Sequence, residues 1–466
     1  MKYFVRDLLI TSLDPRSLTK AIADRVKLKP TSFSYELLSA ERAHINGKLC
    51  VFADFCLTTN EFIRDTSISF SEDAEEPIFP SIAKPPVVVQ ADAFPGLVSA
   101  YLLSRVGNRP ILISKCKTES ELLENLSRRG GFIDRKSGEQ YGRSLSNTLL
   151  DLLGDHGYSR FVFIEPKRMR LLCLVLLKGS LDKGAEIHYG LEATSFRYFL
   201  GKLRSVDCRG ERGSRSFKAE SFVLSSLPFG SKLEEEFAKR SSKRSPSYLG
   251  VYVQSKSRDV DRAIYGTSLV REPRYFHKGT SCLFPFPSGG NFAEIEGCLS
   301  AAPCLLGEDL LGQSLGCFYF PLGKEVALLK LKGEIAESCK RDLLPGSLPA
   351  EPLSCLLSGE EPYSFGLSKG FCPSGFHLAS LPSISSSLSF LKGRFRDFKD
   401  RYQGFLFDSS LVTGFSFFGA IPELAMPDKA GKSSLKGVCS CLSATPSELD
   451  LTALSSFAAK AAIAAL

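Results

Sequence analysis

The chain has 466 residues, which is too long for one hydrophobic core and indicates two or three compact units. Its 43% hydrophobic and 24% charged residues are typical of a globular protein, and a net charge of +8 without a basic tail argues against nucleic-acid binding. No run approaches the ~18 consecutive apolar residues that span a bilayer, and the first residues offer no signal peptide. We therefore expect a cytoplasmic protein that contacts neither nucleic acid nor membrane, and its oligomeric state stays open.

The 14 cysteines are scattered and include no Cys-x-x-Cys pair, so we expect reduced thiols and no metal site. Cys439 and Cys441 are two residues apart, which fits a pair on one face of a strand. The five histidines are isolated from one another, and none is singled out as a catalyst.

The first 70 residues predict a small N-terminal α+β domain. Residues 3–10 read as a strand and residues 15–26 as a helix, because Leu18, Ile22 and Val26 recur at helical spacing. Two more strands are expected at 32–42 and 49–58, which completes a βαββ unit. Residues 71–85 are acidic and contain prolines, as in a linker.

Residues 86–245 predict the first part of a dinucleotide-binding-like domain. Apolar runs at 87–89 and 111–113 flank a helical segment that ends at Gly107, which makes a βαβ unit about 30 residues long. The turn of such a unit normally carries Gly-x-Gly-x-x-Gly. Here Gly96 is in the third place, with Ala91 and Ala93 in the first two. Further helices are expected at 118–129, 145–153 and 168–183, and strands at 185–189 and 216–226.

Residues 246–395 change in character, with short β-like runs at 248–255, 280–286, 292–299 and 325–331 between Pro, Gly and Ser. This pattern predicts a sheet-rich domain inserted into the first one. Residues 396–466 return to the earlier style, with a strand at 437–442 and a helix from about 449. Gly-x-Ser-x-Gly occurs at 312–316 and 366–370, but neither stretch has the strand before it and helix after it that a hydrolase elbow needs.

Four stretches in one order carry a family resemblance: residues 130–136, 183–189, 261–266 and 288–290. With the order of parts, they resemble the NAD(FAD)-utilising dehydrogenase family, uncharacterised FAD-dependent oxidoreductases of the glutathione-reductase-like superfamily, over nearly the whole chain. The resemblance implies an α/β fold: a Rossmann-like FAD/NAD(P)-binding domain with an inserted sheet-rich α+β domain and a small N-terminal βαββ domain. It also implies FAD as cofactor, NAD(P)H as electron donor and a small-molecule substrate of unknown identity.

Four features that a flavin site requires are altered in this chain. Ala93 places a methyl group where the second glycine of the turn would face the pyrophosphate, and Asp92 is expected to cap the helix that follows. Ser114 stands where an acidic residue would bind the ribose. Residues 225–228 replace an Ala-Thr-Gly turn, and residues 441–450 lack every glycine of the family's C-terminal run.

The resemblance places the cofactor-binding residues around the first turn, the end of the second strand and the Gly-rich loop. They are Ala91, Asp92, Ala93, Gly96, Ser114, Lys115, Gly130, Gly131, Asp134 and Lys136. No catalytic residue can be named, since the flavin would carry the chemistry. Two hypotheses follow: an FAD-dependent oxidoreductase with a degraded flavin-binding signature, or a cofactor-free relative that acts as a binding or scaffold protein.

Overall fold

A computed structural model describes residues 2–10, 14–45, 48–63, 65, 68–70, 86–128, 130–155, 157, 160–228, 230–256, 274–277, 280–283, 290–295, 298–303, 313–322, 330–331, 333–335, 337, 349–358, 360, 374–375, 392–393, 395–396, 410–443 and 449–466. Within these residues no helix is long and apolar enough to cross a membrane.

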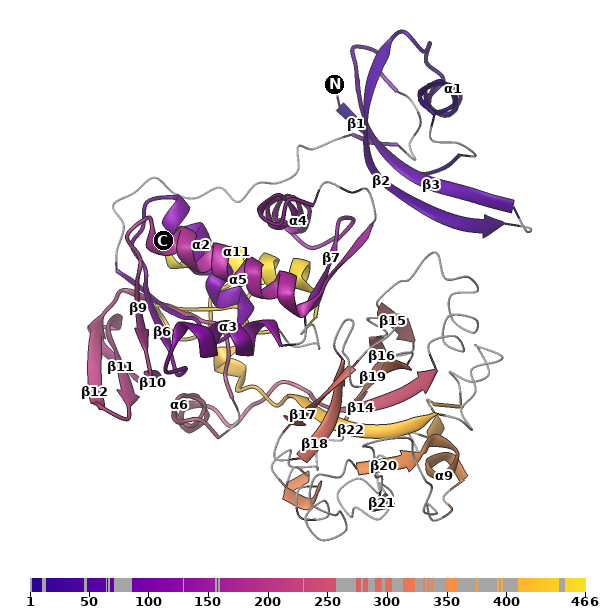
Figure 1. The fold of residues 1–466 in the computed structure, drawn as a ribbon. Coiled ribbons are helices and arrows are strands. Elements are labelled where there is room, and N and C mark those ends of the chain that lie inside the picture. The colour runs from indigo at the N-terminus through magenta and orange to yellow at the C-terminus, as the bar shows by residue number, and fades with distance from the viewer. Residues whose placement is uncertain are drawn as a thin grey trace.

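The N-terminal unit is a four-stranded sheet with one helix against it (Figure 1). Its elements are β1 (Lys2–Ile10), α1 (Pro15–Val26), β2 (Phe33–Ile45), β3 (Lys48–Thr59) and β4 (Ser69–Phe70), in the sheet order β2-β3-β1-β4. The helix begins where expected, because Asp14 accepts hydrogen bonds from the N–H groups of Arg16 and Ser17 and Pro15 occupies the first turn. Its buried face carries the predicted Leu18, Ile22 and Val26. The linker expected at 71–85 lies outside the described residues.

A five-stranded parallel sheet forms the centre of the molecule, which confirms the expected α/β class. The strands are β5 (Val87–Gln90), β6 (Ile111–Ser114), β9 (Glu186–Tyr189), β13 (Ser221–Leu224) and β23 (Val438–Ser440). The sheet order is β23-β13-β5-β6-β9, so the first strand lies in the middle and the chain winds outward in both directions. This is the doubly wound order of Rossmann-type sheets.

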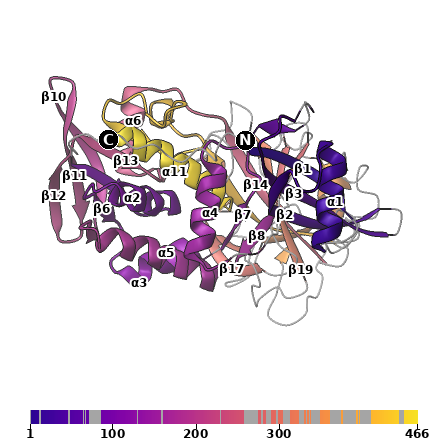
Figure 2. The same ribbon diagram turned by 90° about the horizontal axis from the view of Figure 1, so that it is seen from above.

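Helices cover one face of this sheet and an antiparallel meander covers the other (Figures 1 and 2). The helices are α2 (Phe94–Arg105), α3 (Glu119–Ser127), α4 (Gly142–Leu152), α5 (Pro166–Leu181) and α11 (Leu451–Ala465). The meander is β10 (Glu192–Phe199), β11 (Lys202–Gly210) and β12 (Gly213–Lys218), and α6 (Lys232–Arg240) packs beside it.

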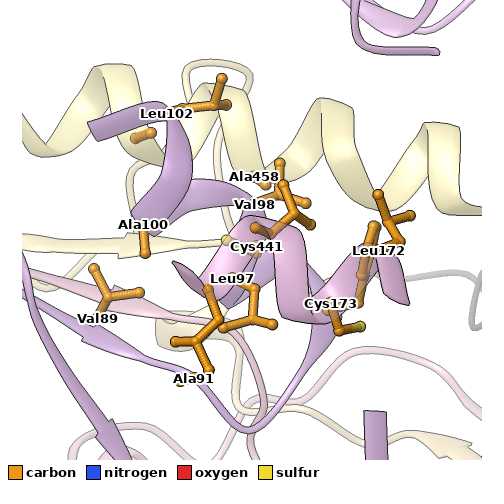
Figure 3. Close-up of a cluster of buried hydrophobic side chains, with 14 of the residues drawn as sticks. Val89, Ala91, Leu97, Val98, Ala100, Leu102, Leu172, Cys173, Cys441 and Ala458 are labelled. Atoms are coloured by element: carbon orange, nitrogen blue, oxygen red, sulfur yellow. The ribbon is translucent and has the colours of Figure 1, made fainter. Parts of the chain in front are cut away.

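Alternate residues of each short strand enter opposite cores, as the strand period of two requires. Val87 and Val89 pack with the helices, whereas Val88 packs with the meander. Figure 3 shows the helical side, where Val89 and Leu97 lie in the same buried cluster as Cys441. Because both faces are covered, every residue of β5, β13 and β23 is buried.

A second sheet of seven strands is built from residues between α6 and β23. It comprises β14 (Ser247–Lys256), β15 (Arg274–His277), β16 (Thr280–Leu283), β19 (Gln313–Pro321), β20 (Pro349–Pro352), β21 (Ser374–Gly375) and β22 (Leu411–Gly419), in the order β15-β16-β19-β14-β22-β20-β21. The strands β17 (Gly290–Ile295) and β18 (Cys298–Pro303) form a separate hairpin. The strands β7 (Gly131–Asp134) and β8 (Phe161–Ile164) form a separate antiparallel pair, with α4 between them in the chain. The structure also describes α9 (Leu353–Ser358) and the short helix η6 (Glu423–Ala425). The domain boundaries given above stay predictions.

Several local predictions need correction. The strand expected at 216–226 is two strands, β12 and β13, because the chain leaves the meander at 219–220 and enters the parallel sheet. The strand expected at 292–299 is divided between β17 and the start of β18, which pair as a hairpin. Most of the strand expected at 325–331 lies outside the described residues, and residues 330 and 331 are helical.

Neither Gly-x-Ser-x-Gly stretch has an observed elbow. Ser314 lies inside β19, paired with Ser255 of β14, so no strand-to-helix turn presents its hydroxyl. The stretch at 366–370 lies outside the described residues, as do 261–266 and most of 288–290, which contributed to the family resemblance.

Candidate functional site

The place where a Rossmann-type sheet binds its ligand is the switch point, at the carboxyl ends of the two strands from which the chain winds in opposite directions. In this chain those strands are β5 and β13. Three segments meet there: the turn from Ala91 to Ala93, the first turn of α2, and residues 225–228 after β13.

The side chain of Gln90 fills the space between the ends of these two strands. Its Oε1 accepts hydrogen bonds from the N–H groups of Ser225 (3.3 Å) and Ser226 (3.2 Å), and Gln90 is 5% exposed. Ser225 Oγ in turn donates to the carbonyl oxygen of Gln90 (2.7 Å). The backbone N–H groups after β13, which would otherwise face a ligand in the crevice, are therefore already satisfied within the protein.

Gly96 serves the packing of α2 on the sheet. A Cβ at this position would lie 2.0 Å from the carbonyl oxygen of Gln90 and 2.9 Å from Ser225 Oγ. This is the role of the third glycine of the Gly-x-Gly-x-x-Gly turn, which permits close helix–strand contact. Ala91 is fully buried in the helical core, so its methyl group is a packing group.

Asp92 does not cap α2, contrary to the expectation from the sequence. The N-cap residue is Ala93, whose side chain makes no cap hydrogen bond, and Gly96 N donates to the Ala93 carbonyl at 2.9 Å. The carboxylate of Asp92 turns instead to the neighbouring strand, where Oδ1 accepts from Ser114 Oγ (2.7 Å) and Lys115 N (3.1 Å). The end of β6 therefore has a carboxylate beside it, although its own residue is serine.

The pKa of Asp92 is raised above its usual value, chiefly because the carboxyl group is buried. The hydrogen bonds from Ser114 and Lys115 and the charge of Lys115 act in the opposite direction, and the charge of Glu192 adds to the increase. Asp92, Ser114 and Lys115 thus lie together at the carboxyl ends of β5 and β6.

The Gly-rich loop lies elsewhere and binds other parts of the chain. Gly131 packs against the start of α11, because a Cβ there would lie 2.8 Å from the Leu451 side chain, and Gly130 has φ +67° with the Ile164 carbonyl 2.4 Å from such a Cβ. Asp134 N donates to Thr452 Oγ1 (2.9 Å), while its carboxylate accepts from Lys136 N (2.9 Å). These residues hold the β7–β8 strand pair against the C-terminal helix α11.

Lys136 joins the central part of the chain to the N-terminal unit. Its Nζ lies 2.9 Å from Asp54 Oδ2 and 3.1 Å from Asp7 Oδ1. Asp54 is 2% exposed and also accepts from the N–H of Asp7 at 2.8 Å. Nearby, the guanidinium of Arg143 lies over the Phe4 ring at 4.1 Å. The structure therefore places Lys136 in a contact between two units.

The N-terminus of α11 is also occupied by the protein. Asp450 is 5% exposed, and its Oδ1 accepts from Ala453 N at 2.9 Å. A carboxylate at this position satisfies one of the free N–H groups and interacts favourably with the positive end of the helix dipole.

A hollow of about 600 Å³ lies one strand away, at the carboxyl ends of β6 and β9. Its lining residues come from the segment after β6, from residues 187–191 and from residues 211–215 around the β11–β12 turn. Four cationic side chains and one acidic side chain line it, which gives a formal charge of +3: Lys115, Lys117, Arg212, Arg215 and Glu211. We call this hollow the edge pocket.

Two contacts organise the charges of the edge pocket. Lys117 Nζ lies 2.7 Å from Glu211 Oε1, and this pairing raises the pKa of Lys117 and lowers that of Glu211. Arg215 Nη1 lies 3.2 Å from His188 Nδ1. Burial, followed by the positive charge of Arg215, lowers the pKa of His188 below its usual 6.5 although Glu186 acts in the opposite direction. His188 is therefore neutral at pH 7.

Four buried cysteines have thiol groups that are protonated at neutral pH. Burial raises the pKa of Cys173, Cys208, Cys439 and Cys441 to about 12 in each case, so these side chains stay protonated at neutral pH. Cys439 and Cys441 pack in one cluster, and no group of His, Cys, Asp and Glu suited to a metal ion occurs in the described part of the chain.

The sequence reasoning missed the contributions of Gln90 and of the β11–β12 turn. Gln90 reads as the last residue of an apolar strand, and residues 211–215 were not recognised as part of a turn. The available signal was the pair of glycines, Gly210 and Gly213, around Glu211 and Arg212, which is typical of a hairpin.

The fold and site define a doubly wound parallel sheet of Rossmann type with a covered switch point. No family model matches the chain, and no curated protein matches it. Similar solved structures include L-amino acid deaminase from Proteus myxofaciens in complex with anthranilate (12% identity, 92% of this chain and 93% of that one, TM-score 0.36). Others are p-nitrophenol 4-monooxygenase PnpA from Pseudomonas putida DLL-E4 (14%, 57% and 64%, 0.29) and the flavin-dependent monooxygenase PieE in complex with FAD and substrate (9%, 53% and 44%, 0.29).

The chain spans less than two thirds of the length of the two monooxygenases. Identities of 9–14% and TM-scores of 0.29–0.36 describe a distant likeness, which assigns no activity to this chain.

Proposed function

We propose that this protein is a binding protein built on a Rossmann-type sheet, and that it binds a small anionic ligand in the edge pocket without flavin redox chemistry. The observation that carries the proposal is the filling of the switch point by Gln90 and Ser225. A dinucleotide bound at the switch point occupies the crevice at the carboxyl ends of these strands.

The residues present do not fit FAD at three places. Ala93 carries a methyl group in the phosphate-binding turn, Gln90 occupies the crevice, and Asp450 places a carboxylate at the start of α11. Each interaction that a pyrophosphate would lose is worth roughly 1.5–3 kcal/mol when charge-assisted. Losing two of them weakens binding by two to four orders of magnitude, at about 1.4 kcal/mol for each factor of ten.

The edge pocket is suited to an anion because it combines an excess of positive charge with free access. Lys115 and Arg212 line it and make no ion pair with another described residue. Tyr189, Gly190 and Leu191 also line the pocket.

Two titrations test this function. The purified chain should be colourless, and FAD should show no saturable quenching of its fluorescence at micromolar concentrations. ADP and inorganic phosphate, measured by calorimetry, should bind, and Lys115→Gln should weaken that binding about tenfold, since a charge-assisted contact is worth about 1.5–3 kcal/mol.

Lys167→Gln is the matched control, because Lys167 is an exposed lysine on α5 outside the pocket. The proposal fails if neither ADP nor phosphate binds, or if Lys115→Gln and Lys167→Gln bind alike. Phosphate binding without any gain for ADP would assign the pocket to a simple anion.

A second candidate is the FAD-dependent oxidoreductase that the sequence resemblance implied, with NAD(P)H as electron donor. The strand order and the meander on one sheet face favour it. A yellow protein with a flavin absorbance that survives gel filtration would support this candidate and contradict the first.

A further inference from the structure

The turn between β10 and β11 presents two large apolar side chains to solvent. Phe199 is 61% exposed and Leu200 is 85% exposed. They are adjacent in sequence, at the apex of a hairpin that pairs Phe199 with Lys202. We call residues Phe199, Leu200 and Gly201 the apolar tip.

The backbone at this tip is unfavourable for leucine. Leu200 has φ +50° and Gly201 has φ +70°, so both central positions of the two-residue turn lie in the left-handed region. Such turns prefer Asn-Gly, because a branched or bulky side chain is strained at the first position. An exposed leucine in a strained backbone conformation does not stabilise the folded chain, which points to a contact of Leu200 with another molecule.

Cationic side chains surround the tip. Residues 197–205 contain Arg197, Lys202 and Arg204 and no acidic residue, and Lys218 lies on the neighbouring strand opposite Ser205. Arg197 pairs with Asp207 at 2.7 Å, whereas Lys202, Arg204 and Lys218 make no ion pair with another residue that the structure describes.

The position of the meander leaves this surface accessible. Figures 1 and 2 both place β10, β11 and β12 at the end of the molecule opposite the seven-stranded sheet. The inner face of the meander is used, since Phe196, Leu203 and Val206 are buried against the parallel sheet and α6. The tip extends beyond this core.

We propose that the apolar tip and its cations dock on an anionic membrane surface. Apolar side chains enter the boundary between headgroups and acyl chains, while nearby Lys and Arg are attracted by anionic lipids. Bases of a single-stranded nucleic acid stack on phenylalanine but offer no apolar region that buries Leu200. An acidic protein would not need the leucine at the strained position. This peripheral contact differs from the sequence expectation of no membrane partner, which considered only bilayer-spanning segments.

Vesicle flotation of the full chain tests the proposal. Wild-type protein should float with vesicles of phosphatidylcholine and phosphatidylserine in equal parts and remain in solution with phosphatidylcholine alone. Added salt should weaken the interaction. Phe199→Ser and Leu200→Asn should each reduce the partition coefficient by about tenfold or more, in line with the burial of one large apolar side chain.

Leu200→Asn also separates function from folding. Asparagine suits the left-handed position, so this variant should melt at the same or a higher temperature than wild type while losing vesicle binding. Leu171→Gln is the matched control: Leu171 is 50% exposed on α5, away from the tip, and its variant should float as wild type does.

The proposal is overturned if wild-type protein ignores anionic vesicles, or if the two tip variants float unchanged. Binding that survives Phe199→Ser and Leu200→Asn but is lost in Lys202→Gln with Arg204→Gln would also overturn it. That result would assign the surface to a purely electrostatic partner, such as an acidic protein.

Discussion

At the scale of single residues, Asp92 has a different role from the one that its position in the sequence suggests. Asp92 follows a strand and precedes a helix, where an N-cap is the usual role of aspartate. In the structure it accepts hydrogen bonds from Ser114 and Lys115 of the neighbouring strand. The local backbone allows both arrangements, and the proximity of β6, which comes from sheet pairing, favours the second.

His188 gives a prediction at this scale. Burial and then Arg215 lower its pKa below 6.5, so the unfolded chain binds the proton more tightly than the folded one. The contribution of His188 to the free energy of unfolding should therefore be fully present above a pH of about 6.5. It should be lost as the pH is lowered from there toward the folded-state pKa. Arg215→Gln should raise the pKa of His188 while the effect of burial remains, as measured by NMR titration of the imidazole C–H signals.

Arg212→Gln is the control for this titration. Arg212 lines the same pocket, but the contact with His188 is made by Arg215. Equal pKa changes in the two variants, or no change in Arg215→Gln, would contradict the assignment of the shift to the charge of Arg215.

At the scale of elements, β5 and α2 approach each other closely at Gly96. The glycine that permits it was recognised in the sequence, but the residue it faces was not. The Gln90 carbonyl and Ser225 Oγ lie at the position of a Gly96 Cβ, so the same contact that packs the helix also closes the switch point.

Gly96→Ala should therefore destabilise the protein strongly. A Cβ 2.0 Å from a backbone oxygen forces α2 away from the sheet, and overpacking of this kind costs about 3 kcal/mol or more. Denaturant unfolding followed by circular dichroism measures the loss. Gly138→Ala is the matched control, since a Cβ there meets nothing within 4 Å and its variant should unfold within about 0.5 kcal/mol of wild type. Equal stabilities of the two variants would contradict the close packing.

At the scale of the whole molecule, Lys136 connects segments that are far apart in sequence. It lies between the buried carboxylate of Asp54 and the exposed carboxylate of Asp7. These two ion pairs share one ammonium group and differ in burial, since the side chains of Asp54 and Asp7 are 2% and 73% exposed. Variants that remove each pair therefore distinguish the effect of burial from that of charge.

Lys136→Met should lower the free energy of unfolding of the N-terminal unit by about 3 kcal/mol, because it leaves a buried carboxylate without this cation. Asp7→Asn should cost less than about 1 kcal/mol, as expected for an exposed pair. Hydrogen exchange at the amides of β1 and β3 measures both changes. A large effect of Asp7→Asn, or none of Lys136→Met, would show that burial of Asp54 does not govern this contact.

Local sequence pattern was sufficient for much of the fold. The caps and apolar spacing of α1 predicted its bounds, and the β-branched runs predicted β5 and β6, because backbone preference and burial agree within a few neighbouring residues. The pattern also located the end of β6, where Ser114 and Lys115 meet Asp92.

Contacts between distant segments decided the rest. Gln90 fills the switch point only because β13, more than a hundred residues later, pairs with β5, and the edge pocket forms only where the β11–β12 turn approaches the end of β6. A side chain's hydrogen-bond partner depends on what the sheet and helices bring within reach, and such neighbours leave no periodic trace in the chain. The glycine pattern therefore showed where a ligand site would lie, and the packing of Gln90 and Ser225 determined that the protein itself occupies it.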